Sequence, residues 1–214
     1  LLTSTSFLDT PGVHQDKLYS AGLEIDTLRG PVKEEILLPI IAQYDGIICG
    51  DDEMTRAVIK TGVEGSLKTI SKYGVGLDKI DLDAVEEFGI PLTNCPGVNQ
   101  VSVAEHVLAL FFSHYKNIHL EYNVTKKGGR KRHIGNEISG KTIGVLGLGK
   151  VGKEVALRAK ALGLTVLVCD PYMDHNFLKT HNIDSVETVE ELVSDIDILT
   201  LHLPLTESSE GLIN

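Results

Sequence analysis

Short apolar runs alternate with longer amphipathic runs along nearly the whole chain. This alternation is typical of βαβ units, in which helices join parallel strands. It predicts an α/β fold built from two successive series of strands. The first series is expected at residues 1–5, 24–28, 46–49, 68–73 and 90–93, and the second at residues 142–146, 165–169 and 196–201.

A long helical pattern over residues 101–122 separates the two series, and a shorter one covers residues 150–162. Ser102 and Glu105 have the spacing of a capping box at the start of the long helix. The polar, basic segment 126–140 that follows is expected to be an extended arm. We therefore expect one domain over residues 1–98 and a second over residues 99–214. The second sheet would have few strands, which predicts a piece of a larger protein.

Composition narrows the class of protein. Twenty basic and thirty acidic side chains give a formal charge of −10, which repels nucleic acid and anionic lipid. The apolar runs fall short of the roughly 20 residues that a membrane helix needs, and no secretory signal is recognised. Three widely spaced cysteines fit neither a metal site nor a disulfide framework. We expect a cytoplasmic protein without a metal.

A glycine-rich motif lies directly after the predicted strand 142–146. Gly147 would allow a tight turn, Gly149 would let the backbone approach a pyrophosphate, and Gly152 would let the following helix pack closely on the strand. Lys150 and Val151 lie in the same loop, where the first N–H groups of the helix can bind phosphate. The pattern predicts a dinucleotide site. The alternative is a glycine turn such as any α/β fold contains.

Asp170 stands at the end of the next predicted strand, 18 residues after Gly152. At this spacing its carboxylate can accept both ribose hydroxyls of an adenosine half. A 2′-phosphate would meet like charge there, and Pro171 and Tyr172 supply no cation. NAD is therefore favoured over NADP. The alternative is that Asp170 only forms the turn before Pro171.

The glycine-rich motif and Asp170 together form a dinucleotide-binding fingerprint. Four further blocks frame this fingerprint, in order: KYGVGLDKID at residues 72–81, NCPGVNQVSVAEHVLA at 94–109, LHLPLT at 201–206 and GLIN at 211–214. With the fingerprint, they resemble the D-isomer-specific 2-hydroxyacid dehydrogenases, which include the phosphoglycerate dehydrogenases. The resemblance implies a flavodoxin-like substrate domain, a Rossmann NAD-binding domain inserted into it, and an active site in the cleft.

The resemblance also implies site residues. The N–H groups of Val75 and Gly76 would hold the substrate carboxylate, because the flanking glycines leave these amides unshielded. Val75 would also lie near the cofactor. Asn99 and Glu105 would lie near the cleft, and Leu203 and Pro204 would lie beneath the nicotinamide ribose. Three of these assignments have a structural alternative: a strand-to-helix turn followed by Asp81 as a helix cap for Val75 and Gly76, the capping box for Glu105, and an ordinary strand end for Leu203 and Pro204.

No residue of this chain is assigned a catalytic role. In the family, the catalytic arginine, glutamate and histidine lie in blocks that follow the GLIN segment, so the trio is expected after Asn214 and the chain alone is expected to be inactive. Four histidines could be mistaken for the missing acid or base. Three are expected on the long helix and one within a strand, where structural roles are favoured: His106, His114, His119 and His202.

The function implied by the resemblance is hydride transfer between NAD and the CH–OH group of a D-2-hydroxy acid. An NAD-sensing regulatory protein, such as the C-terminal-binding corepressors that resemble these enzymes, is the alternative. The resemblance places the acidic segment 50–53 at the mouth of the cleft, where the nearest cations would be Lys72 and Lys79, and three acids there favour a small, singly charged substrate acid. Asp51 and Asp52 could instead form the acidic first turn of a helix near Thr55, pointing into solvent. The basic run 126–133 and the long helix are placed by the resemblance at a homodimer contact.

Overall fold

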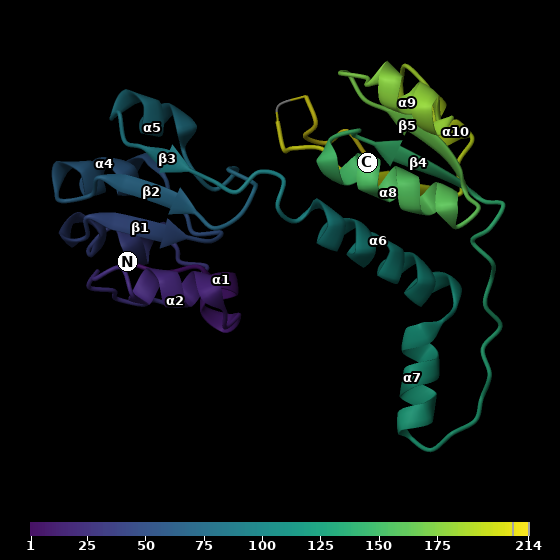
Figure 1. Ribbon diagram of the computed structural model, residues 1–214, viewed down its shortest axis with the longest axis horizontal. Coiled ribbons are helices and arrows are strands. Elements are labelled where there is room, and N and C mark those ends of the chain that lie inside the picture. Colours follow the sequence, from purple (N-terminus) through teal and green to yellow (C-terminus); the bar gives the residue numbers. More distant parts are fainter. Residues whose placement is uncertain (207, 214) are drawn as a thin grey trace. The chain divides into compact units, whose positions relative to one another are not determined.

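Two parallel β-sheets organise the chain, one in each of two units (Figure 1). The computed structural model describes residues 1–206 and 208–213. Its units are Leu1–Pro96 and Gly97–Asn214, so the division lies two residues before the expected boundary. The α/β class with parallel sheets agrees with the alternating pattern of the sequence.

The first unit contains a three-stranded sheet of order β1-β2-β3. Its strands are β1 (Gly46–Cys49), β2 (Thr69–Lys72) and β3 (Leu92–Thr93), and all pair in parallel. The helical elements are α1 (Thr5–Asp9), α2 (Val13–Tyr19), α3 (Glu34–Leu37), the 3-10 turn η1 (Ile41–Gln43), α4 (Arg56–Glu64) and α5 (Leu82–Glu87). Fully buried aliphatic side chains form the core of this unit, among them Ile41, Ile47, Ile59 and Ile70.

Two strands predicted in the first unit, at residues 1–5 and 24–28, are wrong. These described segments contain only isolated β-bridges, which Leu2 forms with Thr27 and with Ile48. The ladder stops because a helix starts at once: the Ser4 side chain accepts a hydrogen bond from the Phe7 N–H and caps α1. A hydroxyl at this position favours a helix start over continued pairing.

Asp52 lies inside the first unit, although the sequence suggested that it could point into solvent. Its side chain is fully buried and accepts three hydrogen bonds, from Thr3 Oγ1 at 2.5 Å, the Val32 N–H at 2.6 Å and the Gly50 N–H at 2.8 Å. These donors come from three separate segments. Asp52 therefore joins the N-terminal segment and the loop before α3 to the carboxyl end of β1.

The second unit contains a four-stranded parallel sheet of order β6-β5-β4-β7. Its strands are β4 (Thr142–Leu146), β5 (Thr165–Cys169), β6 (Asp184–Ser185) and β7 (Ile198–Leu201), joined by α8 (Lys150–Ala161), α9 (His175–His181) and α10 (Val189–Ser194). The predictions for β4, β5 and α8 are confirmed to within one residue. The two-residue strand β6 was not predicted, because so short a polar segment carries no alternating pattern.

The long helix predicted over residues 101–122 is two helices, α6 (Gln100–Tyr115) and α7 (Ile118–Lys126). They separate at Asn117, which adopts the left-handed conformation (φ 55°, ψ 32°) and donates its side-chain amide to the Ile134 carbonyl at 2.9 Å. Asparagine tolerates this conformation better than most residues. The predicted capping box is also wrong: Asn99 occupies the N-cap position, so Ser102 and Glu105 lie inside α6.

An extended loop connects α7 to β4, in agreement with the arm expected there. α6 packs against α8 in the core of the second unit through small side chains, including Ala104, Ala156 and Ala159. Within the described part of the chain, no helix is both long and apolar enough to cross a membrane.

Candidate active site

The glycine loop joins β4 to α8 with the geometry of a phosphate-binding turn. Gly147 has φ +99°, and a Cβ there would lie 2.6 Å from the His202 carbonyl oxygen. A Cβ at Gly152 would overlap the Gly147 carbonyl oxygen. Both positions therefore require glycine, the first for its conformation and the second for close approach.

Gly149 differs from the other two glycines because the space beside it is open. It is the N-cap residue of α8, its own φ is −70°, and no heavy atom lies within 4 Å of the place where its Cβ would be. No side chain caps the helix there. The first N–H groups of α8 have no acceptor within the helix, so this end can receive an anion. The open space and the donors fit a pyrophosphate.

Asp170, directly after β5, is hydrogen-bonded to the glycine loop. Its Oδ2 accepts a hydrogen bond from the Leu148 N–H at 2.5 Å, and its Oδ1 accepts one from the Tyr172 N–H at 2.6 Å. The second bond is the turn-forming role that the sequence left open. The first brings the carboxylate to the loop that would hold the pyrophosphate. Each carboxylate oxygen has a further lone pair for a hydroxyl donor, so both roles can coexist.

The segment after β7 borders the same loop. Leu203 Cδ2 lies 3.0 Å from the position of a Cβ on Gly147. Leu203 and Pro204, with neighbouring apolar residues such as Leu201 and Leu212, line a cavity of about 250 Å³. The segment thus places an apolar wall beside the glycine turn. Val151 is half-buried against the core, and the Lys150 side chain fills the space where a Cβ on Gly97 would lie.

His202 lies directly after β7 rather than within a strand, which corrects the sequence-based placement. Its Nε2 lies 2.9 Å from the Thr200 Oγ1, and burial lowers the pKa of its imidazole below the usual 6.5. A half-buried, hydrogen-bonded imidazole is compatible with the structural role that the sequence favoured.

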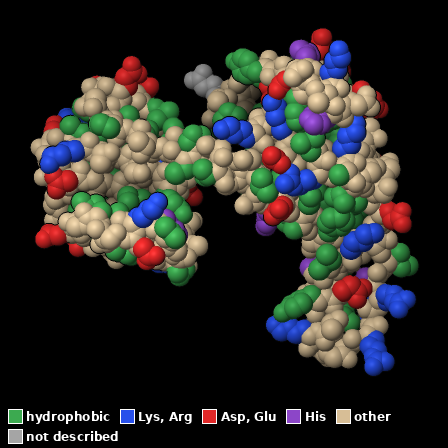
Figure 2. Space-filling model, in the orientation of Figure 1, with side chains coloured by type: hydrophobic (Ala, Val, Ile, Leu, Met, Phe, Trp, Pro, Cys, Tyr) green, Lys and Arg blue, Asp and Glu red, His purple; other side chains and the backbone are tan. Residues whose placement is uncertain are grey.

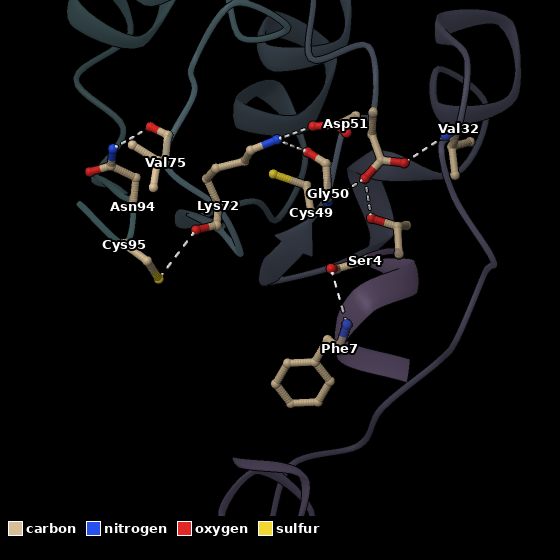
Figure 3. Close-up of polar contacts among 12 residues, drawn as sticks. Ser4, Phe7, Val32, Cys49, Gly50, Asp51, Lys72, Val75, Asn94 and Cys95 are labelled. Atoms are coloured by element: carbon tan, nitrogen blue, oxygen red, sulfur yellow. Dashed lines mark hydrogen bonds and ion pairs between the residues drawn. The ribbon is translucent and has the colours of Figure 1, made fainter. Parts of the chain in front are cut away.

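In the first unit, the turn after β2 exposes two backbone donors. The Gly74 N–H donates to the Lys72 carbonyl, and the Gly74 carbonyl accepts from the Cys95 N–H, each at 2.9 Å. The Val75 carbonyl accepts from Asn94 Nδ2, also at 2.9 Å (Figure 3). Within residues 1–206 and 208–213, the N–H groups of Val75 and Gly76 form no hydrogen bond. A turn fixed by these three hydrogen bonds, with two adjacent free amides, can bind a carboxylate.

Asp81 caps α5, the helix after this turn, as the alternative interpretation held. Its side chain accepts a hydrogen bond from the Ala84 N–H at 2.8 Å. Because Asp81 does not use the Val75 or Gly76 amides, capping and anion binding are compatible. Asn99 and Glu105 belong to the second unit, where Asn99 makes no side-chain cap hydrogen bond and Glu105 is exposed on α6.

Lys72 lies beneath the turn as a buried cation. It is 4% exposed, and its Nζ donates to the Gly50 carbonyl and to Asp51 Oδ1 at 2.7 Å (Figure 3). The sequence pointed to Lys72 as a cation near the expected mouth of the cleft. Its pairing with Asp51 was not foreseen, because ion pairs between neighbouring strand ends leave no mark on sequence spacing.

A second cavity, of about 430 Å³, lies between the end of α7 and the basic loop after it. Figure 2 shows Lys and Arg side chains gathered around this region. Glu121 Oε1 accepts a hydrogen bond from the His133 N–H at 2.5 Å, which lowers the pKa of Glu121. No cluster of three or more His, Cys, Asp or Glu suited to a metal occurs among the described residues.

Known proteins match both units. Residues 108–214 match the sequence profile of the NAD binding domain of the D-isomer specific 2-hydroxyacid dehydrogenases. The D-3-phosphoglycerate dehydrogenase of Methanocaldococcus jannaschii is 35% identical over 96% of this chain and 40% of its own length. The hydroxypyruvate reductase of Thermotoga maritima is 33% identical over 89% of this chain and 61% of its own length.

A solved structure agrees with these sequence matches. The NAD+-bound 3-phosphoglycerate dehydrogenase of Entamoeba histolytica superimposes with a TM-score of 0.73 at 29% identity, over 97% of this chain and 63% of that one. The chain belongs to the D-isomer specific 2-hydroxyacid dehydrogenase family. Its second unit carries the NAD-binding domain of that family, and NAD is the cofactor. The chain spans 40% of the length of the Methanocaldococcus relative.

Proposed function

We propose that the full-length protein is an NAD-dependent oxidoreductase that interconverts a D-2-hydroxy acid and the corresponding 2-keto acid. NAD, when bound, supplies the hydride acceptor of the reaction. The observation that carries the proposal is the pair of binding features in one chain of this family: the open helix end at Gly149 with Asp170 beside it, and the free amides of Val75 and Gly76.

In this proposal the second unit holds the cofactor. The N–H groups of residues 149–152 bind the pyrophosphate, with Lys150 at the first turn of α8 and Val151 and Gly152 forming the helix start. Asp170 accepts hydrogen bonds from the hydroxyls of the adenosine ribose and repels a 2′-phosphate. Leu203 and Pro204 form the apolar wall under the nicotinamide ribose.

The first unit, as the substrate domain, holds the substrate carboxylate on the Val75 and Gly76 amides. Backbone donors in a rigid turn need no reorganisation when the acid binds, so they orient it for the reaction. Asn99, at the start of α6, is assigned to the same substrate site on the basis of the family pattern alone.

We also propose a homodimer in the cytoplasm. Apolar side chains remain exposed on α6, α7 and the loop after them, including Leu110 (56%), Tyr122 (60%) and Ile134 (95%). Covering them with a second copy of the same surface would remove this apolar area from water. The three free thiols, Cys49, Cys95 and Cys169, suit a reducing compartment.

The test is NADH formation at 340 nm by the full-length protein with NAD+ and D- or L-2-hydroxy acids. We expect turnover of a D-acid and at least a tenfold slower reaction with its L-enantiomer. NADH binding without oxidation of any hydroxy acid would contradict the enzymatic proposal and favour an NAD-sensing regulatory protein. Sedimentation of the same protein distinguishes dimer from monomer.

A further inference from the structure

We propose that Asp51 is a specificity-determining residue. It pairs with the buried cation Lys72, repels a second anionic group on the substrate, and so selects 2-hydroxy acids without a phosphate. The inference rests on the proposed function, because it takes the Val75 and Gly76 amides as the seat of the substrate carboxylate. It concerns the remainder of the substrate, beyond the carboxylate and the hydroxyl.

The Lys72 side chain joins Asp51 to the carboxylate-binding turn. A Cβ on Gly74 would lie 3.0 Å from Lys72 Cε and 3.8 Å from its Nζ, and the same Nζ lies 2.7 Å from Asp51 Oδ1. One ammonium group therefore separates the exposed carboxylate from the turn. In the proposal, a three-carbon acid seated on the turn extends past Lys72 toward Asp51.

The Lys72 ammonium group already donates most of its hydrogen bonds to neighbouring protein groups. An ammonium group has three N–H donors, and two of them are used by the Gly50 carbonyl and Asp51. The Lys72 side chain is 5% exposed, whereas Asp51 is 82% exposed. The charge presented to solvent at this strand end is therefore the carboxylate, with the neutralising cation buried behind it.

The other charged groups at the turn do not reverse this sign. Asp78 Oδ1 lies 3.0 Å from the position of a Cβ on Gly76, which places a second carboxylate at the edge of the turn. Lys79 is the remaining cation of the segment, and it is exposed. Asp52 and Asp81 use their oxygens within the fold. A substrate phosphate at this strand end would face the exposed carboxylates of Asp51 and Asp78, whereas Lys72 is buried, and like charges repel.

The test compares two acids that differ only in the phosphate, D-glycerate and 3-phospho-D-glycerate. Each is titrated into the labelled chain, and the amide resonances of Val75 and Gly76 report binding at the turn. The wild-type chain should bind D-glycerate at least fivefold more tightly. In Asp51→Asn the preference should fall at least fivefold through stronger binding of 3-phospho-D-glycerate, with D-glycerate changed less than twofold. Asp51→Glu, which keeps the charge, should restore the preference.

Asp45→Asn is the matched control. Asp45 pairs with Lys68 at 2.5 Å, at the opposite end of the same two strands, so this variant removes an equal charge far from the turn. It should leave the preference unchanged. Equal binding of the two acids by the wild-type chain, or an unchanged preference in Asp51→Asn, would overturn the inference and leave the proposed function intact. If neither acid shifts the Val75 and Gly76 resonances, the carboxylate site itself is refuted, and the inference with it.

Discussion

Gly152 lies so close to Gly147 that a methyl group on Gly152 would overlap the Gly147 carbonyl oxygen. The start of α8 is thus packed directly on the turn that follows β4. Gly149, between them in the same motif, faces open space. The three glycines of the motif therefore have different roles: Gly147 and Gly152 permit close packing, and Gly149 leaves space for a ligand. Alanine substitutions can distinguish these roles.

Gly152→Ala should destabilise the second unit, since either the helix or the turn must shift to admit the methyl group. We expect a loss of about 2–3 kcal/mol, in the range for overpacked positions, measured by hydrogen exchange of β4 and β5. Gly149→Ala should leave exchange unchanged and weaken NADH binding at least tenfold, because the methyl group occupies the pyrophosphate space. Equal stability of the two variants would refute this division of roles.

Asp52→Ala should destabilise the first unit strongly. The substitution leaves the buried Thr3 hydroxyl and the N–H groups of Val32 and Gly50 without an acceptor. Unpaired buried donors cost about 1–3 kcal/mol each, and we expect a total of about 3–5 kcal/mol. Hydrogen exchange of β1 and β2 measures it. Glu86→Ala, at an exposed position of α5, is the control. A loss below about 1 kcal/mol would show that Asp52 does not join these segments.

The stability of the second unit should fall as the pH drops below 7, in part through His202. Burial lowers the folded-state pKa of His202 below its unfolded value of 6.5. The unfolded chain therefore takes up a proton first, and stability is lost between pH 6.5 and the lower folded-state pKa. His202→Gln should reduce this loss, as measured by hydrogen exchange of β7 at pH 7.5 and 5.5. An identical pH dependence in both proteins would contradict the assignment.

The sequence was most informative where hydrophobic periodicity, glycine spacing and strand ends coincide. β4, the glycine loop, α8, β5 and Asp170 follow one another at fixed intervals, so their identity could be read from the chain. The edge segments could not. Leu2 makes β-bridges as a strand residue would, but Ser4 caps a helix two residues later, so no strand forms.

Contacts between segments distant in sequence were also hidden. The pattern of residues 101–122 reads as one helix because the break depends on a single asparagine and its bond to Ile134. The sequence of segment 50–53 indicated an acidic strand end, but it did not indicate which of its carboxylates are buried and which are exposed. Asp52 is buried and structural, whereas Asp51 pairs with Lys72 and remains exposed. Such differences depend on which backbone donors the fold brings close.

The central claim, an NAD site formed by the glycine loop and Asp170, is tested most directly by nicotinamide fluorescence. NADH and NADPH are titrated into the chain, into Asp170→Ala, and into Asp195→Ala, which removes an exposed carboxylate after α10. We expect the chain to bind NADH at least tenfold more tightly than NADPH. Asp170→Ala should lose most of that preference without weaker NADPH binding, and Asp195→Ala should match the wild type. A folded chain that does not bind NADH, or an Asp170→Ala variant that binds it unchanged, would contradict the account.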